Sequence, residues 1–226
     1  MAIKLSRTFV LRKLHQLSGI APLGLFLLEH FYTNSKALAG AKPFNDAVIE
    51  LQQMPYILLL EIFGIFLPLI FHAVYGIFIT LEAKPNTGKY PFARNWMYTL
   101  QRVSGGILFF FILFHVLNFR FGLLAKLGLT QVSVASNPEL AFQLVRDEFS
   151  KTWVFAIYTI GIASTVFHFA NGLWLFLVDW GITIGEKAQR TAAYACLAVG
   201  AALFAVGINA AAAFVRPGGL LGSLLH

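Results

Sequence analysis

The chain has 226 residues, of which 58% are hydrophobic and only 12% charged, and its mean hydropathy is +0.72. This balance excludes an ordinary soluble domain and predicts an all-α integral membrane protein. The formal net charge is +7, but the basic residues form no stripe interleaved with aromatic residues, so a nucleic-acid partner is not indicated. The single cysteine, Cys196, excludes an internal disulfide.

Five apolar runs follow one another along the chain, and each is long enough to cross a bilayer as a helix, which takes about 20 residues. They cover approximately 14–35, 56–81, 98–124, 152–180 and 190–214. We expect a single domain, 1–226, in which the first four helices form a bundle and the fifth lies beside it. The first run is longer than the apolar part of a signal peptide and lacks a persuasive cleavage site, so it is expected to be retained.

The basic residues predict the orientation of these helices. With the N-terminus inside, ten of the 17 Lys and Arg residues fall in the inner segments. Because positively charged loops stay on the cytoplasmic side, the N-terminus is expected in the cytoplasm and the C-terminus outside.

Each of the first four runs carries one histidine well inside it. An ionisable side chain at bilayer depth costs a few kcal/mol, so it is a functional candidate by default. Counting residues from the helix ends places His30 and His115 in the outer half of the membrane. The same count places His72 and His168 in the inner half, so the histidines form an outer pair and an inner pair.

An internal repeat supports this sorting. The second run reads PLIFHAVYG and the fourth STVFHFANG, so each histidine is followed four residues later by a glycine, Gly76 or Gly172. Residues four apart lie on the same helix face, so each glycine is expected to clear space beside its histidine. Ser18-Gly19 and Ser104-Gly105 precede His30 and His115 by about a dozen residues, or roughly 16–18 Å, which is the depth of the inner pair.

Haem b accounts for these features together. Two neutral imidazoles on facing helices make a six-coordinate iron, and small neighbours leave room for a flat macrocycle inside a bundle. The histidine pairs therefore predict two b haems that carry electrons and leave no open iron position for substrate. A haem-free transporter, in which the membrane histidines relay protons, is the alternative of a different class.

The stretches that carry these residues are RKLHQLSGIAPLGLFLLEH, EIFGIFLPLIFHAVYG, RNWMYTLQRVSGG and TVFHFANGLW. Over residues 10–215 the chain resembles the dihaem cytochrome b anchor subunits of bacterial succinate:menaquinone oxidoreductases. The resemblance implies a cytoplasmic-membrane protein with flavoprotein and iron-sulfur subunits on its inner face. Electrons would pass through the two haems to menaquinone, or in reverse during fumarate reduction. A dihaem cytochrome b of a formate dehydrogenase or hydrogenase is a second alternative.

The resemblance also assigns roles to residues. It implies that His72 and His168 ligate an inner, higher-potential haem, and that His30 and His115 ligate an outer, lower-potential haem. His15 matches a family histidine that is not a ligand; it is open to interfacial hydrogen bonding or to contact with a propionate or a quinone.

Propionates and quinone need further polar groups. Gln16 and Arg102 are expected within reach of the inner haem's propionates. Arg102 is the stronger candidate because arginine binds carboxylates in a bidentate manner. The alternative role of Arg102 is to anchor its helix at the inner interface. Related anchors use an outer-side glutamate for quinone chemistry, and Glu50 is the nearest candidate, ahead of Glu61 and Glu29.

Overall fold

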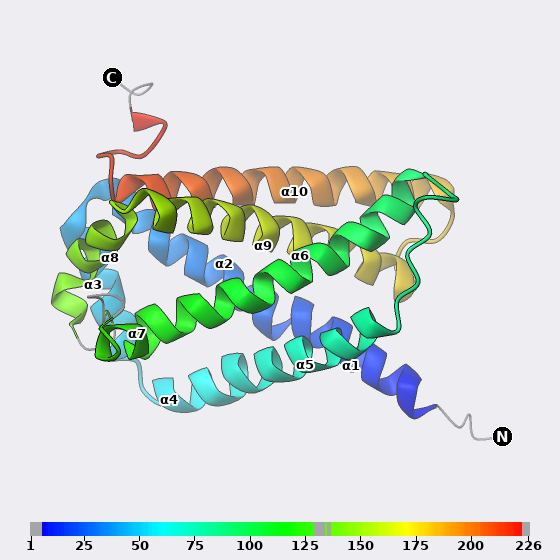
Figure 1. Cartoon of the computed structure of the whole chain (residues 1–226), viewed down its shortest axis with the longest axis horizontal. Coiled ribbons are helices and arrows are strands. Elements are labelled where there is room, and N and C mark those ends of the chain that lie inside the picture. The colour runs from blue at the N-terminus through cyan, green and yellow to red at the C-terminus, as the bar shows by residue number, and fades with distance from the viewer. Residues whose placement is uncertain (1–5, 129–133, 135–136, 223–226) are drawn as a thin grey trace. The chain divides into compact units, whose positions relative to one another are not determined.

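The computed structural model describes residues 6–128, 134 and 137–222, and all regular structure in these residues is helical. The chain divides into two units, each assembled from three separate segments. Unit 1 comprises Met1–Leu27, Leu58–Gly106 and Phe167–Gly200; unit 2 comprises Leu28–Ile57, Ile107–Val166 and Ala201–His226. Figure 1 shows the labelled elements along the chain.

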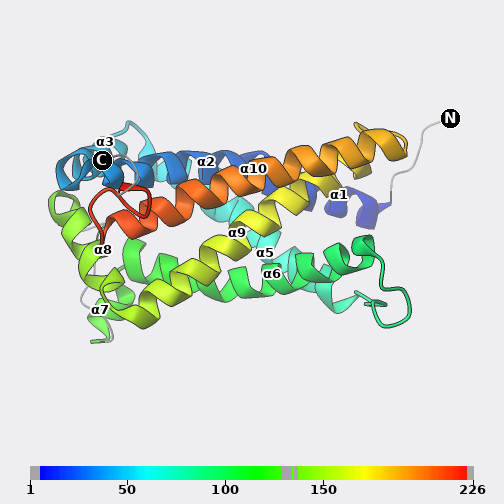
Figure 2. The ribbon, with the colours of Figure 1, turned by 90° about the horizontal axis from the view of Figure 1, so that it is seen from above.

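Four helical stretches are long and apolar enough to cross a membrane. They are Ile57–Leu81, Ala93–Arg120, Thr152–Asp179 and Glu186–Ala213, and the last two are the uninterrupted helices α9 and α10 (Figure 2). Two of them begin earlier than the sequence suggested, at Ala93 where 98 was expected and at Glu186 where 190 was expected. The polar residues at these starts are therefore the first turns of long helices.

The first apolar run forms two helices where one was expected. Helix α1 is Arg7–Ile20 and α2 is Pro22–Ser35, with 14 residues each, and they meet at Ala21. Proline has no N–H to donate, so Pro22 ends the regular bonding of the helix before it. The amide of Ala21 still bonds to the carbonyl of Leu17 at 2.9 Å, so the chain stays helical up to the break.

Two of the long stretches contain π-helical turns. Residues Ile57–Leu59 (α4) lead into a π-helical segment, Leu60–Phe66, which continues as α5, Leu67–Leu81. The ring of Pro68 would meet the carbonyl of Gly64 in an α-helix, and the wider turn before it relieves that clash. Helix α6, Ala93–His115, likewise continues into a π-helical segment, Val116–Arg120, directly after His115.

Within unit 1, α1 packs beside α5 (Figure 1). The N-terminus of α1 is capped by Ser6, whose hydroxyl accepts a bond from the amide of Phe9 at 3.2 Å. On the exposed surface of α1, the guanidinium of Arg12 bonds to the carboxylate of Glu82 at 3.0 Å, and the ammonium of Lys13 donates to the carbonyl of Asp179 at 2.6 Å. These contacts tie α1 to α5 and to the end of α9, which are the helices that carry the inner histidines.

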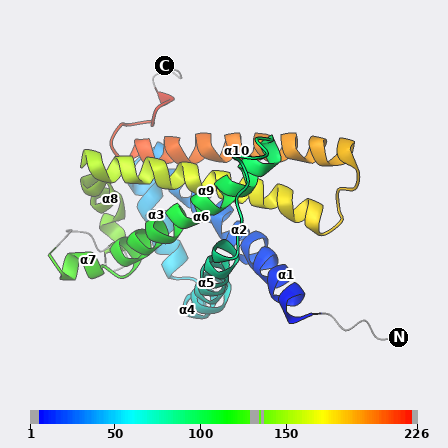
Figure 3. The ribbon, with the colours of Figure 1, turned by 45° about the vertical axis from the view of Figure 1, so that its right-hand side comes forward.

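Within unit 2, the segments between the long helices fold into helices of their own. Helix α3, Ala41–Gln52, lies beside α8, Ala141–Phe149 (Figure 3), and 3-10 turns at Lys36–Ala39 and Pro138–Leu140 precede them. Asn45 joins the two helices by donating to the carbonyl of Glu139 at 2.5 Å and accepting from the amide of Phe142 at 2.8 Å. An aromatic cluster fills the space between them, formed by Phe44, Phe142, Phe149 and Phe214.

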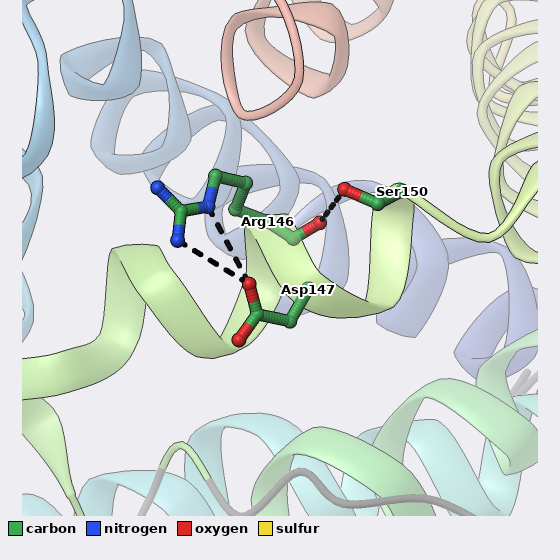
Figure 4. Close-up of polar contacts among 3 residues, drawn as sticks. All are labelled: Arg146, Asp147 and Ser150. Carbon is green, nitrogen blue, oxygen red and sulfur yellow. Dashed lines mark hydrogen bonds and ion pairs between the residues drawn. The ribbon is translucent and has the colours of Figure 1, made fainter.

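The two faces of α8 differ. Its exposed face carries Arg146, whose guanidinium lies 3.4 Å from the carboxylate of Asp147. The Ser150 hydroxyl donates to the Arg146 carbonyl at 2.8 Å (Figure 4). Exposed ion pairs of this kind contribute little to stability. The buried face carries Phe149 and Glu148, whose side chain is 1% exposed. The helix is therefore held by its buried side.

Candidate functional site

The inner pair of histidines lies in unit 1. His72 on α5 and His168 on α9 face each other with ring centroids 6.2 Å apart and ring planes at 83°. Bonds between a first-row metal ion and imidazole are about 2 Å long, so two imidazoles on opposite sides of one ion have centroids roughly 6 Å apart. The separation of the two rings fits that of a ligand pair.

The hydrogen bonds of these rings select their protonation state. Nδ1 of His72 lies 2.9 Å from the backbone carbonyl of His15, and Nδ1 of His168 lies 3.1 Å from the carbonyl of Gln101. A carbonyl oxygen only accepts hydrogen bonds, so in both rings Nδ1 carries the proton. Nε2 then keeps its lone pair, which is the form in which an imidazole ligates a metal.

A serine supports each of these bonds in the same way. The hydroxyl of Ser18 donates to the carbonyl of His15 at 2.8 Å and lies 3.3 Å from Nδ1 of His72. The hydroxyl of Ser104 donates to the carbonyl of Gln101 at 3.1 Å and lies 3.1 Å from Nδ1 of His168. The repeat seen in the sequence is thus also a repeat of contacts.

The glycines after these serines give the histidine rings their space. A Cβ atom added to Gly19 would lie 2.6 Å from Cε1 of His72, and one added to Gly105 would lie 3.1 Å from Cε1 of His168. Any side chain at Gly19 would therefore displace the ring, and one at Gly105 would press on it.

Gly76 and Gly172 have other neighbours than the sequence suggested. A Cβ on Gly76 would lie 3.2 Å from Cε1 of His15, and a Cβ on Gly172 would lie 3.3 Å from Nε2 of Gln101. Each glycine thus receives a side chain from the neighbouring helix, where space beside its own histidine was expected.

Gln101 and Asn171 link the helices around His168. The side chain of Gln101 donates to the carbonyl of His168 at 3.0 Å and accepts from Asn171 at 2.7 Å. Asn171 is buried, and the sequence analysis gave it no role. Its position three residues after His168, on the same helix face, was the available signal.

The two residues expected near the inner propionates have protein partners. Gln16 donates to the carboxylate of Asp179 at 2.6 Å and accepts from the indole of Trp180 at 3.0 Å. The guanidinium of Arg102 lies 3.4 Å from the ring centre of Tyr98 and donates to that residue's carbonyl at 2.7 Å. Its Nε atom is buried and has no hydrogen-bond partner among the described residues, which suits an incoming anionic acceptor.

The outer pair lies in unit 2. His30 on α2 and His115 at the end of α6 have ring centroids 5.7 Å apart and planes at 82°. Nδ1 of His115 lies 2.9 Å from the hydroxyl of Tyr158, whose side chain is buried. Asn34 donates to the carbonyl of His30 at 2.7 Å and lies 3.4 Å from its Nε2. Tyr158 was not among the residues predicted from the sequence.

The candidate glutamates differ in setting. Glu50 is exposed on α3, outside the helix of Ile57–Leu81, and lines a shallow hollow of about 490 Å³ together with Asp46, Gln53 and Met54. Glu29 accepts a bond from Thr33 at 2.5 Å, and Glu61 lies in the π-helical segment Leu60–Phe66. Among the described residues, no group of three or more His, Cys, Asp or Glu side chains is arranged to hold a metal ion.

Comparison with known proteins gives a family and a relative for the chain. A family model described as the succinate dehydrogenase/fumarate reductase transmembrane subunit matches residues 82–207, more than half of the chain. The chain is 41% identical over 210 residues to the succinate dehydrogenase cytochrome b558 subunit of Bacillus subtilis (strain 168), a match that covers 93% of this chain and 98% of that protein. The chain therefore belongs to the family of succinate dehydrogenase/fumarate reductase transmembrane subunits.

Proposed function

We propose that this chain carries electrons between the iron-sulfur subunit of a succinate dehydrogenase and menaquinone, through two b haems each held by two histidines. The same path would run in reverse during fumarate reduction. The observation that carries the proposal is the state of the inner pair, in which both Nδ1 protons are held by carbonyl oxygens and both Nε2 lone pairs remain for iron. The name of the Bacillus subtilis relative, a cytochrome b558 subunit, supports haem b as the ligand.

Haem b supplies a one-electron carrier when it is bound. His72 and His168 would hold one haem, and His30 and His115 the other. The carbonyls of His15 and Gln101 keep the inner imidazoles in the tautomer that binds iron, and Ser18 and Ser104 donate to those carbonyls. Two histidine ligands for each haem would leave its iron no open position and would restrict it to electron transfer.

The membrane arrangement that we propose has five crossings, with the N-terminus in the cytoplasm and the C-terminus outside. Four crossings are the long apolar stretches. The fifth is α1 and α2 together, since 14 residues in each plus Ala21 extend about 43 Å when helical, more than the hydrocarbon thickness of about 30 Å. The kink at Pro22 is compatible with a membrane helix.

The partners follow from the family and from the charge distribution. The flavoprotein and iron-sulfur subunits would dock on the cytoplasmic face, where ten of the 17 Lys and Arg residues are expected. Electrons would enter the inner haem first because it is nearer to that face. Arg102 is the residue that we assign to a propionate of this haem; Gln16 would have to exchange Asp179 or Trp180 for the propionate.

Menaquinone chemistry needs a group that donates or accepts protons beside a quinone oxygen. We assign this role to Glu50, because its carboxylate lies at the wall of an open hollow with apolar neighbours at Ile49, Met54 and Pro55. A quinone head group requires such a mixed surface.

The test is to purify the complex from membranes and to measure haem b per chain, together with flavin and iron-sulfur cluster content. The proposal expects two haems. Replacing His72 or His168 should remove one and the same haem, and replacing His30 or His115 should remove the other. Spectra in which the His168 and His30 variants lack the same haem would contradict the pairing, and a complex without haem absorbance would refute the function.

A further inference from the structure

The two halves of the inner site match residue by residue except at one position. In the first half, helix α1 contributes His15, Ser18 and Gly19, which contact His72 or Gly76 of α5. In the second half, helix α6 contributes Gln101, Ser104 and Gly105, which contact His168 or Gly172 of α9. The carbonyl acceptor, the serine and both glycine contacts recur with the same spacing. The unmatched pair is therefore His15 and Gln101.

Gln101 uses its side chain to bond the neighbouring helix, but His15 uses its ring differently. The His15 ring lies flat on the ring of His72, with centroids 4.0 Å apart and planes 13° from parallel. Gly76 leaves room for it, and Tyr75 flanks it with a ring centroid 5.9 Å away. Nδ1 of His15 is buried and makes no side-chain hydrogen bond to any described residue, so the main contact of the ring is the stacking on His72.

We propose that His15 is a positioning residue that sets the plane of the His72 ring, and with it the 83° angle between His72 and His168. The inference rests on the proposed function, in which these two rings ligate one haem iron. His15 acts in two ways: its carbonyl oxygen accepts a hydrogen bond from Nδ1 of His72, 2.9 Å away, and its ring covers one face of the His72 ring.

The stacked ring is needed because the hydrogen bond alone restrains the plane weakly. A hydrogen bond tolerates angular deviations of tens of degrees. Rotation of the His72 ring about its Cβ–Cγ bond would preserve the hydrogen bond to the His15 carbonyl over much of this range. The same rotation would drive the edge of the His72 ring into the His15 ring. His168 has no such cover from Gln101, whose amide is bonded to the His168 carbonyl instead.

The angle between axial imidazole planes has a direct spectroscopic consequence. Crossed planes bring the lowest iron d orbitals of a ferric, low-spin haem close in energy, and the largest g value of its electron paramagnetic resonance spectrum rises. Planes that relax toward parallel lower that g value. The inner haem's g value therefore reports the orientation of His72 without any measurement of activity.

Two substitutions test the ring of His15 independently of its backbone carbonyl, because both variants keep the carbonyl. His15→Gln copies the residue of the second half and removes the stacked ring, while His15→Phe keeps a flat ring in its place. In the purified complex we expect both haems in each variant. We expect a lower largest g value for the inner haem in His15→Gln, near wild-type values in His15→Phe, and an unchanged outer-haem signal in both.

A third variant tests the same contact without changing His15. Gly76→Ala places a Cβ atom 3.2 Å from the His15 ring and should shift the inner-haem signal in the direction of His15→Gln, whereas Gly172→Ala presses on Gln101 and should not. If His15→Gln does not assemble, Gly76→Ala decides the question. An unchanged inner-haem signal in His15→Gln, or an equal shift in His15→Phe, would overturn the inference while leaving the function intact. Absence of an inner-haem signal from the wild-type complex would instead refute the proposed function.

Discussion

The hydroxyl of Tyr158 lies 2.9 Å from Nδ1 of His115, and the phenol is only 5% exposed. This bond orients the His115 imidazole as the backbone carbonyls orient the inner pair; a phenol hydroxyl can accept as well as donate, so it can receive a hydrogen bond from Nδ1 when that nitrogen carries the proton. Groups that orient a metal-binding histidine usually contribute roughly 10- to 100-fold to metal affinity. Tyr158→Phe is therefore expected to weaken retention of the outer haem by about that factor, measured as haem content after purification.

The matched control is Ser104→Ala, which loses the corresponding hydroxyl beside His168. It should affect the inner haem and spare the outer one, as seen in separate redox titrations of the two haems. An outer haem that is retained fully in Tyr158→Phe would show that the phenol does not support His115.

Alanine at Gly19 and at Gly105 should have graded effects. The added Cβ would lie 2.6 Å from the His72 ring at the first site and 3.1 Å from the His168 ring at the second. Overpacking costs about 1–3 kcal/mol, and a shift of His72 would also disturb ligation. Gly19→Ala should therefore lose more inner haem than Gly105→Ala, measured by the haem to protein ratio; the reverse order would contradict the observed geometry.

Lys151 balances a buried charge in unit 2. Its ammonium lies 2.6 Å from Glu148, whose side chain is 1% exposed, while Lys151 itself is 39% exposed. Removing one partner of a fully buried pair costs about 3–5 kcal/mol, and the exposure of Lys151 reduces this to about 2 kcal/mol. Lys151→Met should lower the Tm of the complex and Glu148→Gln in the same chain should recover part of the loss. Equal Tm values for Lys151→Met and the wild type would contradict this account.

Glu50→Gln tests the assignment of the quinone group. Loss of a general acid or base typically slows a reaction about 10²- to 10⁴-fold, so menaquinone reduction by succinate should fall within that range. Both haem spectra, and succinate oxidation with an artificial acceptor at the flavin, should stay unchanged. Asp46→Asn in the same hollow is the control, because Asp46 is already paired with Lys42 at 2.6 Å. Equal losses in the two variants would argue against a specific role for Glu50.

Position along a helix could be inferred from the sequence because the rise per residue of a helix is constant. Counting residues was enough to group His72 with His168 and His30 with His115, and the structure brings the same pairs together. It also placed Ser18 and Ser104 at the level of the inner pair, where they meet the two histidines.

Rotation about the helix axis could not be inferred in this way, because it depends on how neighbouring helices cross. Gly76 follows His72 on the same face, yet the side chain that fills its space comes from α1. Tyr158 was missed for the same reason, since only the packing of α9 against α6 turns its hydroxyl toward His115. Helices α3 and α8 were missed because, with 12 and 9 residues, they are shorter than the roughly 20 apolar residues of a membrane crossing.

The π-helical segment Leu60–Phe66 gives the helix before His72 a place where a change of one residue in chain length can be absorbed. A π-helical turn accommodates one residue more than an α-helical turn, so it can be converted to α-helix by deletion of a single residue. Because the number of turns stays the same, such a deletion would leave the residues before the segment nearly in phase with α5, whereas a deletion within regular α-helix would rotate them by about 100°. A one-residue deletion in Leu60–Phe66 is therefore expected to change the direction of His72 less than a one-residue deletion between Leu67 and His72.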